Sequence, residues 1–322
     1  MKWLAPILFS GSAGILPART RANVMNWPAG SRRSQLAAWA WTVLFSATAL
    51  TALAAEPPGK LVEPGVLLVG KIQNPRLTES SGLVVSRKDP EVFWTHNDGG
   101  GKRQVLYAMT RHGQPLAEYR ITGAVLDDWE DLAIDDAGHL FISDTGNNDA
   151  KPITIRVHQI NEPDIKASTT GIAPVTRSWN LRYPAAPFDC ESLFIWGSNG
   201  YLVSKVFNDT RATIYKFSLT NHTPLQTLAV VGEVKIDSPV TGADISRDGK
   251  LLALVAKNGA YVFSIHGDVA RALKGKPYQT KFKHEHIESC TFVPEGLLAT
   301  AESREIYLFT DEAFRTGPGK KK

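Results

Sequence analysis

Carboxylate side chains recur at one position of a repeated segment in this 322-residue chain. The five aligned segments begin Glu79-Ser-Ser-Gly-Leu, Asp128-Trp-Glu-Asp-Leu, Asp189-Cys-Glu-Ser-Leu, Val240-Thr-Gly-Ala-Asp and His286-Ile-Glu-Ser-Cys. Their third residues are Ser81, Glu130, Glu191, Gly242 and Glu288. Carboxylates gathered in one place raise one another's pKa unless a cation balances them, and Ca²⁺ takes about six to eight oxygen ligands. The pattern therefore predicts a Ca²⁺ ion held by the three glutamates and Ser81.

A second interpretation of these glutamates stays open. Lys205, Lys257 or Arg304 would neutralise them, and the glutamates would then only order water in a channel. Asp128 and Asp189 stand two residues before two of the glutamates, where they would serve as outer ligands or as hydrogen-bond caps.

Another set of polar residues follows the second predicted strand of each unit. It comprises His96-Asn97-Asp98, Asp144 with Asn147 and Asn148, Asn208-Asp209, Asn258-Gly259 and Glu302-Ser303-Arg304. Asn, Asp and Gly are also ordinary turn formers, so each turn has a purely structural interpretation as well. If the turns face a substrate, Asp98, Asp144 or His96 would act as general base. The substrate-binding candidates are Asn97, Asn147, Asn148, Lys205, Asn208, Asp209, Lys257 and Arg304.

The elements that must position these residues are short strands. The aligned positions recur at intervals of 46 to 61 residues, close to the roughly 40–50 residues of a propeller blade. Each segment opens a series of predicted strands separated by turn residues, and the widest interval carries a polar insertion at residues 161–170. The sequence therefore predicts an all-β fold, a single β-propeller of five blades. Six blades of about 45 residues would also fit the length.

Closure of the ring is predicted from the two ends of the repeat. The fifth unit stops one strand short, and a spare predicted strand, residues 66–72, lies near the start of the repeat region. Borrowing this N-terminal strand would complete the last blade and remove an open sheet edge. Because antiparallel strands alternate in direction, the start of each inner strand and the turn after the second strand share one face. Both sets of polar residues are therefore expected at one mouth of the central channel.

Residues 1–55 are predicted to be a leader outside the fold. Arg32 and Arg33 precede an apolar run, and Ala52-Leu53-Ala54 has the small-x-small pattern of a signal-peptide cleavage site. Met25 is an alternative start of translation. An uncleaved membrane anchor is the competing interpretation of the apolar run.

The propeller would occupy residues 56–315, followed by a disordered basic tail at 316–322. Cys190 and Cys290 are the only cysteines. They fall in non-neighbouring blades, so we expect two buried free thiols rather than a disulfide, even in an oxidising compartment. We expect an exported monomer, periplasmic or extracellular, that contacts a membrane only through an uncleaved leader.

Several classes of function are disfavoured by composition and motifs. The net charge of +4 is modest and partly located in the two ends of the chain, so no basic stripe for nucleic acid is present. No Gly-x-Ser-x-Gly elbow and no phosphate-binding glycine loop between a strand and a helix occurs. His96, His284 and His286 form no tight cluster with cysteine, which disfavours a transition-metal site. A small-molecule or envelope ligand at the propeller mouth is therefore the expected partner.

Four segments carry a resemblance to known proteins. Glu79-Ser-Ser-Gly-Leu, Trp94-Thr-His-Asn-Asp-Gly-Gly, Asp128-Trp-Glu-Asp-Leu-Ala and Asp144-Thr-Gly-Asn-Asn resemble a group of secreted bacterial β-propeller proteins, largely uncharacterised. More distantly, the blade pattern is similar to that of the calcium-dependent apyrases, five-bladed propellers that hydrolyse nucleoside diphosphates. That resemblance implies an axial Ca²⁺ at the starts of the inner strands, held by the serine and the three glutamates aligned above. Gly242 departs from the scheme, since it stands where a further ligand would be.

Two functions stay open. The first is a calcium-dependent hydrolase of phosphoester or phosphoanhydride substrates, with esters and lactones as the other substrate class, in which the metal would polarise the scissile group. The second is a non-catalytic propeller that binds a ligand or protein at the cell envelope, with Ca²⁺ serving to stiffen the ring. Fold alone does not decide between them.

Overall fold

The computed structural model describes residues 59–99, 104–207, 209, 211–236 and 239–315. The predicted leader and basic tail lie outside these residues. Within them the chain forms β-strands and one short 3₁₀ helix, η1 (Val269–Leu273). None of the helical structure in this part is long and apolar enough to cross a membrane.

The described strands form four sheets, and the nine-stranded sheet is divided by the parallel pairing of β6 with β10 into two antiparallel groups. We call the resulting five antiparallel groups the first to fifth blades. The first blade contains β3 (Ser80–Val85), β4 (Phe93–Asn97), β5 (Val105–Met109) and β6 (Pro115–Thr122); the second contains β7 (Trp129–Ile134), β8 (His139–Asp144), β9 (Thr154–Asn161) and β10 (Thr170–Arg182). The third contains β11 (Leu193–Trp196), β12 (Asn199–Val203), β13 (Arg211–Ser218) and β15 (Ala229–Lys235); the fourth contains β16 (Val240–Ile245), β17 (Leu251–Ala256), β18 (Gly259–Ser264) and β19 (Tyr278–Lys281). The fifth contains β20 (Ile287–Val293), β21 (Gly296–Ala301), β22 (Glu305–Thr310), β2 (Val66–Lys71) and β1 (Lys60–Glu63).

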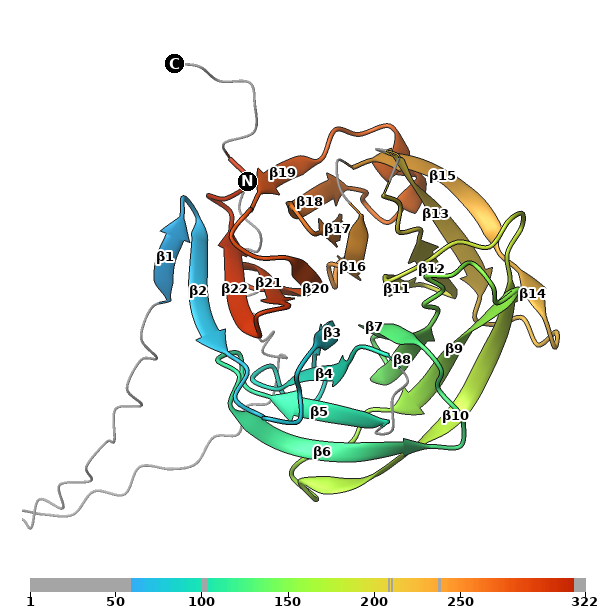
Figure 1. The fold of residues 1–322 in the computed structure, drawn as a ribbon, viewed down its shortest axis with the longest axis horizontal. Helices are drawn as coiled ribbons and strands as arrows, with labels where there is room; N and C mark the ends of the chain where they lie inside the picture. Colours follow the sequence, from blue (N-terminus) through green and yellow to red (C-terminus); the bar gives the residue numbers. More distant parts are fainter. Residues whose placement is uncertain (1–58, 100–103, 208, 210, 237–238, 316–322) are drawn as a thin grey trace, which may run out of the picture. The chain divides into compact units, whose positions relative to one another are not determined.

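The first strands of the five blades form a closed inner ring. β3 contacts β7, β7 contacts β11, β11 contacts β16, β16 contacts β20, and β20 contacts β3. Figure 1 shows the remaining strands of each blade extending outward from this ring. The chain is a β-propeller, as the sequence predicts.

The N-terminal strand closes the ring, also as predicted. β2 pairs antiparallel with β22, and β1 adds an outer strand that the sequence analysis did not identify. The end of β2 is held by Arg304, whose Nη2 donates to the carbonyls of Ile72 at 2.7 Å and Asn74 at 2.8 Å. The Ile72 N–H in turn donates to the Arg304 carbonyl at 2.8 Å. These bonds join the two ends of the repeat region.

The polar insertion between the second and third repeats, residues 161–170, is mostly the loop between β9 and β10, and the strand that follows it bridges two blades. β10 is 13 residues long, and its first half pairs parallel with β6 of the first blade. Its second half pairs antiparallel with β9 of its own blade. Two further residues, β14 (Gln226–Thr227), pair parallel with the end of β10. The longest repeat interval therefore adds contacts at the rim of the ring and leaves the inner ring unchanged.

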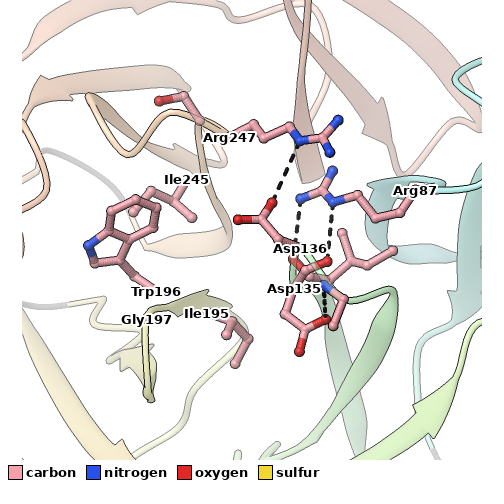
Figure 2. A pocket seen from close by; sticks show the side chains of 11 residues that line it. Arg87, Asp135, Asp136, Ile195, Trp196, Gly197, Ile245 and Arg247 are labelled. Carbon is pink, nitrogen blue, oxygen red and sulfur yellow. Dashed lines mark hydrogen bonds and ion pairs between the residues drawn. The ribbon is translucent and has the colours of Figure 1, made fainter.

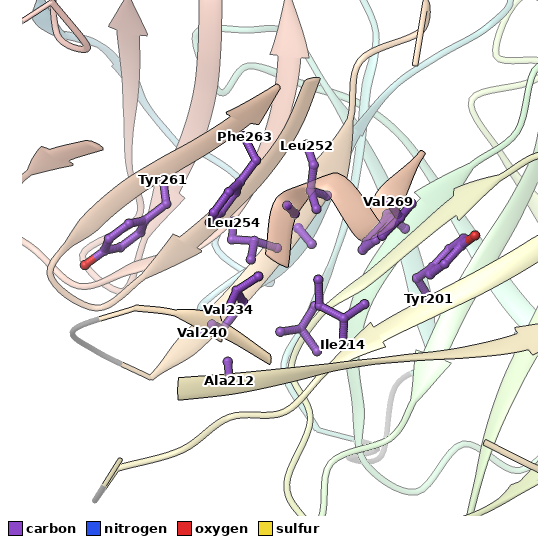
Figure 3. Close-up of a cluster of buried hydrophobic side chains, with 14 of the residues drawn as sticks. Tyr201, Ala212, Ile214, Val234, Val240, Leu252, Leu254, Tyr261, Phe263 and Val269 are labelled. Carbon is purple, nitrogen blue, oxygen red and sulfur yellow. The ribbon is translucent and has the colours of Figure 1, made fainter. Parts of the chain in front are cut away.

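Adjacent blades bury their faces against each other. Inner strands are covered on both faces, so β7 is buried at all six of its residues, although it includes Glu130 and Asp131. One hydrophobic cluster lies between the third and fourth blades and contains Ile214, Leu254 and Phe263, with Val269 of η1 at its outer side (Figure 3). Cys190 and Cys290 are both buried and free, as the sequence predicts.

Buried aspartates link the inner strands within the ring. Asp131 on β7 accepts hydrogen bonds from the backbone N–H of Leu132 at 2.8 Å and of Leu193, on β11, at 2.7 Å. It also accepts a longer bond of 3.4 Å from Ala243 on β16. Asp244 likewise reaches from β16 to β20, where it accepts from the Phe292 N–H at 2.8 Å. These side chains lie between two pockets, one formed where inner strands begin and one where they end.

Candidate functional site

A cavity of about 510 Å³ lies where the inner strands begin. Eight of the predicted site residues line it: Ser81, Asp98, Glu130, Asn148, Glu191, Lys205, Lys257 and Glu288. Thr78, Glu79, Ser80 and Glu302 complete the lining. The starts of inner strands and the turns after second strands therefore meet in one place, as expected from the alternation of strand direction.

Glu130 is the most crowded acid of this cavity. It is 2% exposed, and no hydrogen-bond partner for its Oε2 exists among the described residues. Burial raises the pKa of Glu130 well above its ordinary value, and the carboxylates of Asp98 and Glu191 raise it further. Gly146 packs closely on two acids: a Cβ there would lie 2.3 Å from both the Glu130 Oε1 and the Asp128 Oδ2, so these side chains would have to move.

Three acids bring their oxygens close enough to share one cation. Ligand atoms of Asp98, Asp128 and Glu130 all lie within 4.8 Å of one another. Two oxygens that each lie about 2.4 Å from one Ca²⁺ are at most about 4.8 Å apart, so the spacing fits a single ion. Burial raises the pKa of Asp128 to about 6, and Asp98 and Asp189 contribute to the rise. Asp128, expected only as an outer ligand or cap, thus joins Glu130 in the best-formed cluster.

Glu191 faces Lys205 across the cavity. The Lys205 ammonium contacts Glu191 Oε1 and lies 3.5 Å from Asp189 Oδ2. Burial raises the pKa of Glu191 to about 7, against the opposing effect of the lysine charge. Neutralisation by an ion pair with lysine, the second interpretation of the sequence, therefore applies to Glu191. Among the described residues no lysine forms an ion pair with Glu130, although the charge of Glu130 also raises the pKa of Lys205.

Glu288 and Glu302 form a carboxyl pair. Burial, together with the hydrogen bond to Glu302, raises the pKa of Glu288 to about 8. The Glu302 carboxylate lies 3.4 Å from the Lys257 ammonium and 3.2 Å from the His286 Nδ1. The pKa of Glu302 is accordingly lowered, because the bonds from Glu288 and His286 outweigh its burial. At neutral pH, Glu288 keeps a proton that it donates to Glu302.

Ser81 lines the cavity with its hydroxyl already engaged. Its Oγ donates to the backbone carbonyl of Glu130 on the neighbouring inner strand. The oxygen lone pairs of such a hydroxyl stay available to a cation.

Two of the three predicted general bases lie outside the cavity. His96 is fully buried and stacked on Trp129, with ring centroids 4.4 Å apart. Burial lowers the pKa of His96 to about 4, so its imidazole is neutral at physiological pH. Asp144 accepts from the backbone N–H groups of Asp127 at 2.9 Å and Asp128 at 2.8 Å, which holds the turn before β7. Of the three, only Asp98 reaches the cavity.

Several predicted substrate-binding residues hold loops together. Asn97 accepts from the Thr78 N–H at 2.8 Å and donates to the Arg76 carbonyl at 2.8 Å. Asn147 donates to the Tyr183 hydroxyl at 2.9 Å, and Arg304 holds the end of β2 as described above. For these residues the turn-forming interpretation of the sequence agrees with the contacts.

Asp209 lies between β12 and β13. Asp209 pairs with Arg211 at 3.3 Å and does not line the cavity. Asn208 lies outside the described residues.

Comparison with known proteins leaves the family of the chain open. Neither a family model nor a curated protein sequence matches it. Among solved structures it is similar to the Dos1 propeller, with 13% sequence identity and a TM-score of 0.38. The likeness covers 73% of this chain, which spans 57% of the length of that one. The propeller fold stated above therefore rests on the strand pairing, and the function rests on the cavity.

Proposed function

We propose that the acidic cavity binds Ca²⁺, with Glu130 as the central ligand and Asp98 and Asp128 beside it. The observation that carries the proposal is the state of Glu130, a buried carboxylate with an unpartnered oxygen and no cationic side chain on it among the described residues. Burying an unpaired carboxylate is costly. A hard divalent cation with oxygen ligands offsets that cost, and Glu191, Glu288 and Ser81 supply further oxygens in the same cavity.

The proposed reaction is hydrolysis of a phosphoester or phosphoanhydride. A bound Ca²⁺ supplies Lewis-acid polarisation of a phosphoryl oxygen. Lys257, 29% exposed at the cavity wall, is placed to bind the anionic group of a substrate. Burial raises the pKa of Glu191 to about 7 in the metal-free protein, and a bound Ca²⁺ would favour its ionised form, which accepts a proton. With His96 and Asp144 outside the cavity and Asp98 proposed as a ligand of the ion, Glu191 is the acid proposed for proton transfer.

Metal binding is tested by calorimetric titration of the EDTA-treated protein with Ca²⁺. Glu130→Gln should weaken Ca²⁺ binding by at least about tenfold, because the amide removes the central charge. Glu91→Gln, at an exposed position, is the matched control and should bind as the unaltered protein does. If Glu130→Gln binds Ca²⁺ as tightly as the control, the site is elsewhere.

Catalysis is tested separately with the same proteins. Nucleotides, phytate, p-nitrophenyl phosphate, p-nitrophenyl esters and lactones are incubated with the protein in EDTA and in excess Ca²⁺. We expect release of phosphate that requires Ca²⁺ and is lost in Glu130→Gln. Turnover that is unaffected by EDTA would refute the calcium-dependent mechanism.

A second candidate function is binding of a ligand or protein at the same site without catalysis. The burial of His96 and Asp144 favours it, because two expected bases are removed from the mouth. Under this alternative, Ca²⁺ binding and Ca²⁺-dependent stability persist while no substrate in the screen is turned over.

Export of the protein remains a proposal that rests on the predicted leader. Expression of the full chain in a Gram-negative host, followed by N-terminal sequencing of the periplasmic product, tests it. A new N-terminus near residue 55 is expected, whereas a cytoplasmic product with an intact leader would contradict export.

A further inference from the structure

A second pocket lies at the opposite end of the inner ring from the acidic cavity. It has a volume of about 330 Å³ and is formed where β7, β11 and β16 end. Figure 2 shows side chains of the second, third and fourth blades facing one another across it, with Arg87 entering from the first blade. No residue of the acidic cavity contributes to this pocket.

The base of the pocket is apolar. Ile134, Ile195 and Ile245, each at or next to the end of an inner strand, are buried beneath it. The indole of Trp196 forms one wall and is held by a hydrogen bond of 2.9 Å from its Nε1 to the Gly267 carbonyl. A flat apolar ligand would bury its surface against these side chains without any rearrangement of the indole.

Two guanidinium groups lie at the other side of the pocket. Arg87 donates from Nε to the Asp135 carbonyl at 3.2 Å and from Nη2 to the Ile134 carbonyl at 3.4 Å. Its Nη1 makes no hydrogen bond to another described residue, and the guanidinium lines the pocket. Arg247 also lines the pocket, with its Nε 3.6 Å from Asp136 Oδ1.

The acids near these guanidinium groups are engaged by other groups or exposed to solvent. Asp135 accepts from the Ala137 and His139 backbone N–H groups and pairs with the His139 ring, and its carboxylate points away from the guanidinium groups (Figure 2). Asp136 and Arg247 are 69% and 72% exposed, and such a solvated pair contributes little. Asp244, close enough to Arg87 for that charge to act on it, already accepts from Ile245, Thr291 and Phe292.

We propose that this pocket is a second binding site, for a small carboxylate with a flat apolar body. The body would lie on the three isoleucines beside Trp196, and the carboxylate would accept hydrogen bonds from Arg87 and Arg247. A volume of about 330 Å³ accommodates a ligand of this size. The site is independent of Ca²⁺ and of the reaction proposed for the acidic cavity.

The probes are 3-phenylpropanoate and its neutral amide, 3-phenylpropanamide, which share a shape and differ in charge. Binding to the full protein is measured by calorimetry and by ligand-observed NMR. We expect the carboxylate to bind at least about fivefold more tightly than the amide. Equal binding of the two probes, or no binding of the carboxylate at millimolar concentration, would overturn the proposal.

Variants locate the site. Arg247→Ala removes an exposed cation and should weaken carboxylate binding by at least about fivefold without changing the melting temperature. Trp196→Leu removes the aromatic wall and should weaken both probes to a similar extent. The control Arg271→Ala, at an exposed arginine of η1, and the Glu130→Gln variant should bind both probes normally. Loss of binding in either control with retention in Arg247→Ala would place the ligand elsewhere.

Discussion

Without metal, the buried carboxyl groups should make the stability of the fold fall as the pH rises from about 5 to about 8. His96, whose pKa burial lowers from 6.5 to about 4, should oppose only the part of this fall below about pH 6.5. Burial raises the pKa of Glu191 from 4.5 to about 7 in the folded protein, in spite of Lys205. A carboxyl group whose pKa is raised by folding contributes stability that is fully present below its unfolded pKa. That contribution is lost as the pH rises through the folded value. At about 1.36 kcal/mol per pKa unit, Glu191 alone accounts for roughly 3 kcal/mol.

Glu288 extends the same effect to higher pH. Burial and Glu302 raise the pKa of Glu288 to about 8, so its contribution is lost between about pH 4.5 and pH 8. Because Glu130, Glu191 and Glu288 lie in one cavity, their protons are lost in shared steps. Bound Ca²⁺ stabilises the ionised carboxylates, so saturating Ca²⁺ should flatten the pH dependence and raise the free energy of unfolding most at pH 8.

The assay is urea-induced unfolding, followed by tryptophan fluorescence at pH 5, 6, 7 and 8, in EDTA and in excess Ca²⁺. Glu191→Gln should remove up to roughly 3 kcal/mol of the fall in EDTA, since the amide does not ionise. The exposed Glu91→Gln control should keep the full slope. If the EDTA-treated protein is equally stable at pH 5 and pH 8, or more stable at pH 8, then the pKa values of the buried carboxyl groups are not raised by folding.

Three further substitutions test how the ring and the cavity are held. Arg304→Ala removes two hydrogen bonds to the end of β2 and should lower the free energy of unfolding by about 2–3 kcal/mol. Amide exchange in β2, measured by mass spectrometry, should become faster, and unchanged exchange would show that Arg304 does not hold this strand. Asp131→Ala leaves the Leu132 and Leu193 N–H groups without their acceptor and should lower the free energy of unfolding in urea by about 3 kcal/mol or more. A decrease below about 1 kcal/mol would show that water replaces the carboxylate. Lys205→Met removes the charge that lowers the pKa of Glu191 and should make the fall in stability with pH steeper in EDTA; an unchanged slope would mean that the lysine does not act on Glu191.

The fold was largely predictable because propeller blades repeat in sequence as well as in space. The recurring position of Glu130 and its equivalents marks the start of each inner strand, and the spare strand beginning at Val66 completes the last blade. The bridging strand β10 was not predictable, because its parallel pairing with β6 joins residues about 50 positions apart that show no shared pattern. The outer strand β1 was missed as well, since four residues carry too little periodicity to identify a strand.

The candidate site was predictable in position but not in composition. Strand alternation places Asp98 and Glu130 at one mouth, and the cavity contains both. The same reasoning also placed His96 and Asp144 there, although one side chain stacks under Trp129 and the other turns back to the backbone. The side chain of a turn residue either lines the cavity or forms contacts within its own loop. The spacing of residues along the sequence does not distinguish these two cases.

The sequence by itself determined that acids recur on inner strands, because a repeat of one blade unit carries the same residue to equivalent places around a ring. Tertiary structure alone decided which of these acids has a cationic partner. Lys205 reaches Glu191, and Lys257 reaches Glu302, while Glu130 is crowded by Asp98 and Asp128. The physical reason is that the pKa of a carboxyl group depends on burial and on charges within a few ångströms, which side chains from different blades create only when the ring closes.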